Sequence, residues 1–151
     1  MKVIYFDMDG TVADLYGVPN WLEKLRSFDA SPYIEAKPLV NMAELEKVCR
    51  TLISQGYQIG IITWLSKDSN NKYDRKVIQA KYEWFEHYMP YITSYHPIAY
   101  GIPKQKAVKR ASKMILVDDN AEVRKMWDTP KTRKSIDANK DIIAELWKLV
   151  E

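Results

Sequence analysis

The stretch VIYFDMDGTVADL, from Val3 to Leu15, decides the fold and raises the question of function. Its first four residues are typical of a buried strand, and Asp7 and Asp9 follow that strand at once. Two carboxylates on alternate residues of an extended backbone project to roughly the same side and repel each other. We therefore expect a cation between or beside them, and a divalent metal ion is the simplest choice.

The overall composition favours one globular domain spanning residues 1–151. A content of 46% hydrophobic and 12% aromatic residues is enough for a single buried core. The formal net charge of +3 comes from basic and acidic residues spread along the chain, which favours anionic partners mildly and lacks the clustered basic patch of nucleic-acid-binding proteins. The single cysteine, Cys49, is expected to be a buried structural thiol on a helix.

The chain carries no signal-peptide pattern and no apolar run of membrane-spanning length. We therefore expect a cytoplasmic protein that does not associate with membranes.

Apolar runs alternate with helical patterns along the chain, which predicts an α/β fold with a parallel sheet flanked by helices. The strands are expected at Lys2 to Phe6, Tyr57 to Thr63, Tyr91 to Tyr95 and Met114 to Val117. The helices are expected from Pro19 or Asn20, from Asn41 to Gly56, from Tyr73 to Met89, from Pro103 to about Ser112, from Ala121 to Trp127 and from Asn139 to Val150.

We predict no helix for two segments of the chain. Pro32 and Pro38 are expected to hold SPYIEAKPLV extended, since proline disfavours helical geometry in the residue before it. TPKTRKSI is interpreted as a basic surface stretch, in which Lys131, Arg133 and Lys134 form a solvated face.

Polar side chains follow three of the predicted strands. Asp7 and Asp9 follow the first, Thr63 ends the second, and Asp118 with Asp119 follows the last. Ligands of open parallel sheets bind beyond the carboxyl ends of the strands, so these groups are expected on one rim. Each alone is also typical of a turn, a helix cap or an ordinary strand residue. Together they require a compensating positive charge, and a set of oxygen ligands without histidine or cysteine suits Mg²⁺.

These residues also carry a family resemblance. DMDGT at Asp7 to Thr11, the Thr63 that closes the strand IIT, Lys104 near the start of a helix, and ILVDD ending at Asp119 are similar to the four ordered motifs of the haloacid dehalogenase (HAD) superfamily. The resemblance covers the chain from Val3 to Asp119. It implies a Rossmann-like, HAD-like domain and the activity of a Mg²⁺-dependent phosphoric monoester hydrolase.

The resemblance assigns roles to the four acidic residues. Asp7 would be the nucleophile that receives the phosphoryl group and a metal ligand. Asp9 would donate a proton to the departing alcohol and later remove one from water, while its backbone carbonyl binds the metal. Asp118 would complete the protein ligands, with Asp119 alongside or bound through water.

Phosphate binding is expected from Thr63, Lys104 and the backbone amides of the turn from Met8 to Gly10. These groups would neutralise a transferring phosphoryl group that otherwise repels an incoming carboxylate. Lys106 is the alternative to Lys104, because several lysines lie close together in KQKAVKRASK.

Residues from about 15 to 38 have the length of a small cap insert after the first strand. This insert, with FDASPYIEAKPL and AKYEWFEHYMP, resembles the 5'-nucleotidase branch that includes the 5'(3')-deoxyribonucleotidases. The resemblance implies a small phosphorylated substrate, with a 5'-nucleotide or deoxynucleotide as one choice. Tyr16, Trp21 and Tyr33 would either stack on a base or anchor the cap by packing.

Two other interpretations remain open from the sequence. One is a non-catalytic phosphate-binding or regulatory domain on the same fold. The other is a response-regulator receiver, which also gathers Asp, Thr and Lys on a parallel sheet, although its acidic pair comes early in the chain and here the pair comes last.

Overall fold

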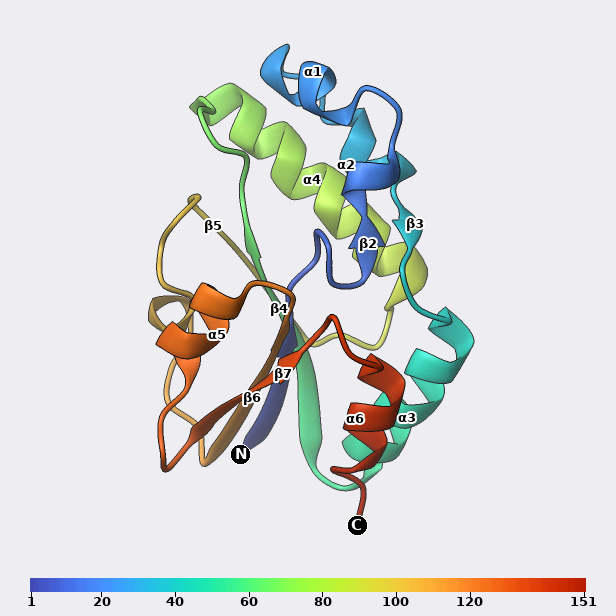
Figure 1. Cartoon of the computed structure of the whole chain (residues 1–151), viewed down its shortest axis with the longest axis vertical. Coiled ribbons are helices and arrows are strands. Elements are labelled where there is room, and N and C mark those ends of the chain that lie inside the picture. Colours follow the sequence, from blue (N-terminus) through green and yellow to red (C-terminus); the bar gives the residue numbers. More distant parts are fainter.

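A five-stranded parallel sheet forms the centre of the molecule in this computed structural model, which describes residues 1–151. The strands lie in the order β5-β4-β1-β6-β7, so the first strand is central (Figure 1). Their bounds are β1 Lys2–Phe6, β4 Tyr57–Trp64, β5 Ser94–Ile98, β6 Lys113–Asp118 and β7 Arg133–Asp137. The predicted α/β class with a Rossmann-like parallel sheet is therefore confirmed.

The strand order also decides against the receiver interpretation. Counted along the chain, the parallel strands run 3-2-1-4-5, which is the Rossmann order. Receivers have the flavodoxin-like order 2-1-3-4-5, in which the first strand lies between the second and the third and does not pair with the fourth. The receiver interpretation is wrong.

Helices cover both faces of the sheet. The helices α3 (Met42–Ser54), α4 (Asn71–Tyr88) and α6 (Ile142–Trp147) contribute to the larger hydrophobic core, together with Ile4 and Phe6 of β1. The helix α5 (Ala121–Trp127) lies on the opposite face, where Val123 and Trp127 pack with Val3 and Tyr5 (Figure 1). Successive residues of β1 thus enter opposite cores, as expected for a strand covered on both sides.

The insert stands on a two-stranded antiparallel ribbon. The strand β2 (Ala13–Asp14) pairs with β3 (Lys37–Pro38), and between them lie the 3-10 helix η1 (Leu15–Gly17), α1 (Trp21–Arg26) and α2 (Ser31–Glu35). In Figure 1 these helices lie at the top of the molecule beside the first half of α4. The buried ring of Tyr33 and the hydrogen bond from the Trp84 indole to the Ala36 carbonyl, at 2.8 Å, attach the insert to α4.

Most predicted elements are present close to their expected bounds. The predictions for Lys2 to Phe6 and for Ala121 to Trp127 match β1 and α5. Asn41 caps α3 as expected, since its side chain accepts hydrogen bonds from the amides of Ala43 and Glu44. Cys49 is fully buried on that helix, and burial raises the pKa of its thiol to about 12, in agreement with a structural role.

Two predictions around prolines are wrong. Residues Ser31–Glu35 form the helix α2, because Pro32 lies in the first turn, where a missing N–H costs no hydrogen bond. The helix expected from Pro103 to Ser112 is only the 3-10 helix η2 (Lys104–Ala107). The segment that follows has too few apolar residues to bury a helical face against the sheet.

Three further predictions need correction, two of them at the edge strands of the sheet. The basic stretch contains the edge strand β7, which pairs in parallel with β6 and shows the charged composition common at edges. The strand β5 begins at Ser94, three residues later than expected. The helix α6 is limited to Ile142–Trp147, and its later start is due to Asp141, which caps it. No helix of the chain has the length and apolar content needed to cross a membrane.

Candidate active site

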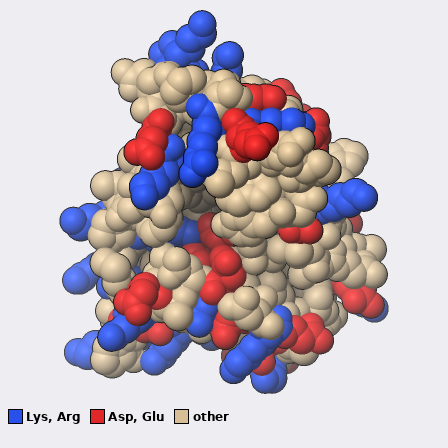
Figure 2. All heavy atoms as spheres, turned by 45° about the horizontal axis from the view of Figure 1, so that its top comes forward, with Lys and Arg blue, Asp and Glu red and all other residues tan.

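A pocket of about 490 Å³ opens between the insert and the carboxyl ends of the sheet strands. Asp7, Asp9, Lys104, Asp118 and Asp119 all line it. Figure 2 shows the hollow face of the molecule, on which acidic and basic atoms are interspersed and neither sign forms a continuous patch. The rim predicted from three separate strand ends therefore exists as one concave site.

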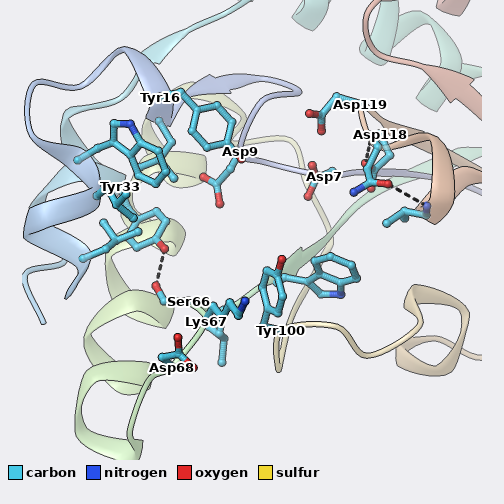
Figure 3. Close-up of a pocket in the computed structure, with 18 of the residues that line it drawn as sticks. Asp7, Asp9, Tyr16, Tyr33, Ser66, Lys67, Asp68, Tyr100, Asp118 and Asp119 are labelled. Carbon is cyan, nitrogen blue, oxygen red and sulfur yellow. Dashed lines mark hydrogen bonds between the residues drawn. The ribbon is translucent and has the colours of Figure 1, made fainter.

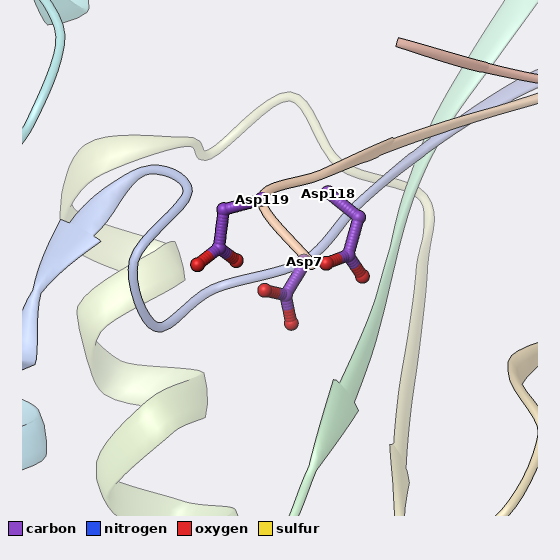
Figure 4. Close-up of side chains that lie close together, drawn as sticks. All are labelled: Asp7, Asp118 and Asp119. Atoms are coloured by element: carbon purple, nitrogen blue, oxygen red, sulfur yellow. The ribbon is translucent and has the colours of Figure 1, made fainter. Parts of the chain in front are cut away.

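Three carboxylates face one another on the floor of the pocket. Asp7 follows β1, Asp118 ends β6 and Asp119 is next in the chain (Figure 4). One oxygen from each lies within 4.8 Å of the others. The Thr11 hydroxyl lies 3.1 Å from both Asp7 Oδ2 and Asp119 Oδ1 and thus connects two members of this cluster. The parallel pairing of β1 with β6 produces the arrangement, because it brings the ends of the two strands together.

Lys104 lies inside this carboxylate cluster. Its ammonium donates to Asp7 Oδ1 at 2.8 Å and to Asp118 Oδ2 at 2.6 Å, and the residue is only 3% exposed. Lys106, the alternative phosphate-binding lysine, is exposed on the same short helix. The geometry thus favours Lys104 over Lys106 as the phosphate-binding lysine. The loop after β5 places Lys104 at the rim of the sheet.

Crowding of negative charge shifts the acid–base behaviour of the cluster. Burial, followed by the charge of Asp7, raises the pKa of Asp118 to about 6 and that of Asp119 to about 6. The pKa of Lys104 is also raised, because the attraction of Asp7 and Asp118 outweighs the opposing effect of burial. One ammonium does not compensate three carboxylates, so the cluster suits an additional cation.

A second group of contacts surrounds Asp9. The ammonium of Lys81, on α4, donates to Asp9 Oδ2 at 2.9 Å, to Thr63 Oγ1 at 2.8 Å and to the Trp64 carbonyl at 2.7 Å. Lys81 is fully buried, and its ammonium also lies 4.8 Å from the centre of the Tyr33 ring. This lysine therefore links α4, the end of β4 and the acidic turn.

Asp9 retains one oxygen without a protein partner. Its Oδ1 is buried and accepts no hydrogen bond, although the residue lines the pocket. Burial raises the pKa of Asp9, and the nearby Lys81 ammonium opposes that rise. In Figure 3 the Asp9 side chain lies between Asp7 and the tyrosines of the insert.

The turn after β1 provides backbone donors, but not all those expected. The Gly10 amide donates to the Ala13 carbonyl at 2.9 Å and is therefore engaged within the turn. The amides of Met8 and Asp9 donate to no group of the chain, and the Asp9 carbonyl accepts no hydrogen bond. Gly10 is required for another reason: its φ is +79°, and a Cβ there would lie 2.6 Å from Asp119 Oδ2.

Aromatic side chains form the walls of the pocket (Figure 3). Tyr33 is buried and its hydroxyl is hydrogen-bonded to Ser66, so it anchors the insert. Tyr16 is 56% exposed and packs edge to face with Trp21. Trp64 and Tyr100 form the opposite wall with ring centres 5.1 Å apart. Tyr33 thus anchors the insert by packing, as one of the two interpretations predicts, and Tyr16 is accessible from the pocket.

The sequence did not reveal every residue of the site. Thr63 is fully buried behind the pocket, where it contacts Lys81, and the hydroxyl that lines the pocket after β4 belongs to Ser66. Lys81 lies within the helix predicted from Tyr73 to Met89 and outside the four motifs, so it is not among the predicted site residues. A lysine within an otherwise apolar helical stripe is the signal that identifies it, because lysine is rarely fully buried without a partner.

No known family model matches this chain, and no curated protein matches it. The HAD resemblance of the four motifs thus remains a prediction, and the geometry of the chain's own residues carries the functional argument.

Proposed function

We propose that this chain is a Mg²⁺-dependent phosphatase that hydrolyses a small phosphate monoester through an aspartyl-phosphate on Asp7. The observation that carries the proposal is the grouping of Asp7, Asp118, Asp119 and Lys104 at the carboxyl ends of parallel strands, with Asp9 beside them in the same pocket. This combination offers a nucleophile, a cation site, a phosphate-neutralising ammonium and a second carboxyl for proton transfer.

The donor set fits a hard divalent cation. Asp7, Asp118 and Asp119 offer carboxylate oxygens at short mutual distances, and the carbonyl of Asp9, two residues after Asp7, accepts no hydrogen bond within the chain. Mg²⁺ prefers such oxygen ligands and keeps some of its water. When bound, it would neutralise charge on the phosphoryl oxygens and on the attacking carboxylate.

The residues of the chain account for both halves of the reaction. In the first, an Asp7 carboxylate oxygen attacks phosphorus, the bond from phosphorus to the alcohol oxygen breaks, and Asp9 transfers its proton to that oxygen. In the second, water attacks the phosphorus, its proton returns to Asp9, and inorganic phosphate leaves Asp7. Lys104 and the amides of Met8 and Asp9 stabilise the negative charge on the phosphoryl oxygens in both steps.

The substrate class is part of the proposal. A pocket of about 490 Å³ with Tyr16 and the pair Trp64 and Tyr100 on its walls has room for a small phosphorylated molecule, of which a 5'-nucleotide or deoxynucleotide is one example. Rates of phosphate release from a panel of nucleotides, sugar phosphates and phosphopeptides would show which class of substrate the chain prefers.

Phosphate release from 4-nitrophenyl phosphate tests the activity itself. We expect release with Mg²⁺, none with EDTA, and a loss on the order of 10³-fold or more in Asp7→Asn. Asp128→Asn, an exposed aspartate of the same type, is the matched control and should retain full activity. Unchanged activity in Asp7→Asn would exclude this nucleophile. If the wild type hydrolyses nothing in the panel yet binds inorganic phosphate, the chain is the non-catalytic phosphate-binding domain instead.

A further inference from the structure

Lys81 is a buried lysine that the proposed reaction does not yet use. It is 0% exposed, lies on a helix outside all four motifs, and has three oxygen acceptors within 2.9 Å. A buried ammonium is costly unless it is paired and hydrogen-bonded. Asp9 supplies the charge, and Thr63 and the Trp64 carbonyl accept the remaining hydrogen bonds.

The contacts of Lys81 constrain one oxygen of Asp9 and not the other. Oδ2 is held by the ammonium, whereas Oδ1 has no hydrogen-bond partner in the chain. A carboxylate held through one oxygen has a defined orientation, and its second oxygen remains free for a reacting group. The Tyr33 ring also lies against the ammonium, with its centre 4.8 Å from Nζ.

The other lysine of the site cannot perform this task. Lys104 donates to Asp7 and Asp118 and makes no hydrogen bond to Asp9. Asp9 therefore depends on Lys81 for its orientation, and the contact with Thr63 and the Trp64 carbonyl fixes the ammonium to the end of β4.

We infer that Lys81 is a positioning residue for proton transfer: it holds Asp9 Oδ2 so that Oδ1 is the oxygen that exchanges the proton with the leaving alcohol and with water. This inference rests on the proposed phosphatase function. Lys81 does not contact the phosphoryl group in this role and acts only through Asp9.

The dependence of the rate on the leaving group tests the inference. A 4-nitrophenolate leaves readily without a proton, whereas an alkoxide needs one, so proton transfer matters mainly for alkyl phosphates. In Lys81→Met we expect kcat for an alkyl phosphate such as glycerol phosphate to fall about 10²-fold, and kcat for 4-nitrophenyl phosphate to fall less than about tenfold, with KM for both nearly unchanged. Lys76→Met, an exposed lysine on the same helix, should alter neither rate.

The Asp9→Asn background separates positioning from a structural role. If Lys81 acts through Asp9, adding Lys81→Met to Asp9→Asn should lower kcat for the alkyl phosphate little further. Full additivity of the two losses would overturn the inference, and so would an equal loss for both esters in the single variant.

Folding of the variants is followed by thermal unfolding. If Lys81→Met does not fold, Lys81→Gln, which retains an N–H donor without the charge, replaces it and should show a smaller effect with the same preference for the alkyl ester. Loss of the fold in both variants would overturn the inference, because Lys81 would then be a structural residue. A wild type that hydrolyses neither ester refutes the proposed function itself, whereas an active wild type with unselective Lys81 variants refutes only this inference.

Discussion

The two buried lysines of the site have different surroundings. Lys104 contacts two carboxylates, Asp7 and Asp118, and a third, Asp119, belongs to the same cluster. Lys81 contacts one carboxylate, that of Asp9, and two neutral oxygens. Negative charge is therefore in excess around Lys104 and balanced around Lys81.

This difference indicates what each half of the site does. Excess negative charge in a buried cluster favours binding of a cation, so the proposed function assigns the metal and the phosphoryl group to the Lys104 half. A charge-balanced pair attracts a further ion less strongly, and the hydrogen bond from Lys81 to Oδ2 holds the Asp9 carboxylate in one orientation. Under the same proposal, the Lys81 half orients Asp9 for proton transfer.

Lys104→Met should have the largest effect and separates the two halves most clearly. Removing one partner of a buried ion pair costs about 3–5 kcal/mol, and we expect the free energy of unfolding without metal to fall by at least about 3 kcal/mol. Phosphatase activity should fall about 10²–10³-fold, because the transferring group loses its ammonium. Chemical denaturation and phosphate release measure the two effects.

The control for this prediction is Lys106→Met, which removes an exposed lysine from the same 3-10 helix and should change stability by less than about 0.5 kcal/mol. Mg²⁺ should restore part of the stability of Lys104→Met, since it can bind the carboxylates that have lost the lysine ammonium. It should not restore the stability of Lys81→Met. Equal rescue of both lysine variants by Mg²⁺ would contradict the assignment of the metal to one half.

The pH dependence of metal binding should show the same asymmetry. Since Asp118 and Asp119 each have a pKa of about 6, protons compete with Mg²⁺ as the pH falls through 6. Metal affinity should decline by about tenfold for each of these carboxylates per pH unit below that value. A Mg²⁺ titration followed by the shift in melting temperature, repeated between pH 8 and about pH 5, measures this.

Without metal, a falling pH has the opposite effect: protonation of Asp118 and Asp119 increases the stability of the fold. The pKa of each group is higher in the folded protein than the ordinary value of 3.8, so the folded state binds protons more tightly. Their stabilising contribution is complete below about pH 4 and is lost as the pH rises through about 6. A metal affinity that stays constant from pH 7 to about 5 would show that these carboxylates are not ligands.

Gly10→Ala tests the turn that supports the acidic cluster, with a smaller expected effect. The positive φ of Gly10 costs about 1–2 kcal/mol for a residue with a Cβ, and the new Cβ would displace the Asp119 carboxylate. We expect this loss of stability together with weaker binding of Mg²⁺. Thermal unfolding with and without the metal measures both.

Gly101→Ala is a closely matched control. Its φ is +85°, similar to that of Gly10, but an added Cβ would meet no atom within 4 Å. The two variants should therefore lose similar stability from the backbone alone, and only Gly10→Ala should lose metal affinity. A comparable change of metal affinity in both would mean that displacement of Asp119 is unimportant.

The sequence predicts the central part of this fold well for a physical reason. The strands β1 and β6 are buried on both faces, so their apolar runs are unbroken and end abruptly at Asp7 and Asp118. The edge strand β7 has one neighbour and carries Arg133 and Lys134, so no apolar run marks it. The local pattern of apolar residues therefore identifies the inner strands and misses the edge strand β7.

The same reasoning explains which site residues were predicted. Asp7, Asp9, Asp118 and Asp119 follow strands, and the topology of a parallel sheet determines where strand ends lie. Lys81 reaches the site from the middle of α4, at a position that only the packing of that helix against the sheet reveals. The engagement of the Gly10 amide with Ala13 likewise depends on the exact path of the turn, which residue types alone do not specify.

The cap of α5 provides the smallest predicted effect, adjacent to the acidic pair. The Asn120 side chain accepts hydrogen bonds from the amides of Glu122 and Val123, and the backbone amide of Asn120 donates to Asp118 Oδ1 at 2.9 Å. Asn120→Ala should lower the free energy of unfolding by about 1 kcal/mol and weaken Mg²⁺ binding a few-fold, since fraying of α5 loosens the residue that follows Asp118 and Asp119. Asn41→Ala removes an equivalent cap from α3, at a helix outside the pocket, and should cost similar stability without changing metal affinity. If both variants shift the Mg²⁺ midpoint equally, metal binding responds to global stability, and the local connection between α5 and Asp118 has no separate role.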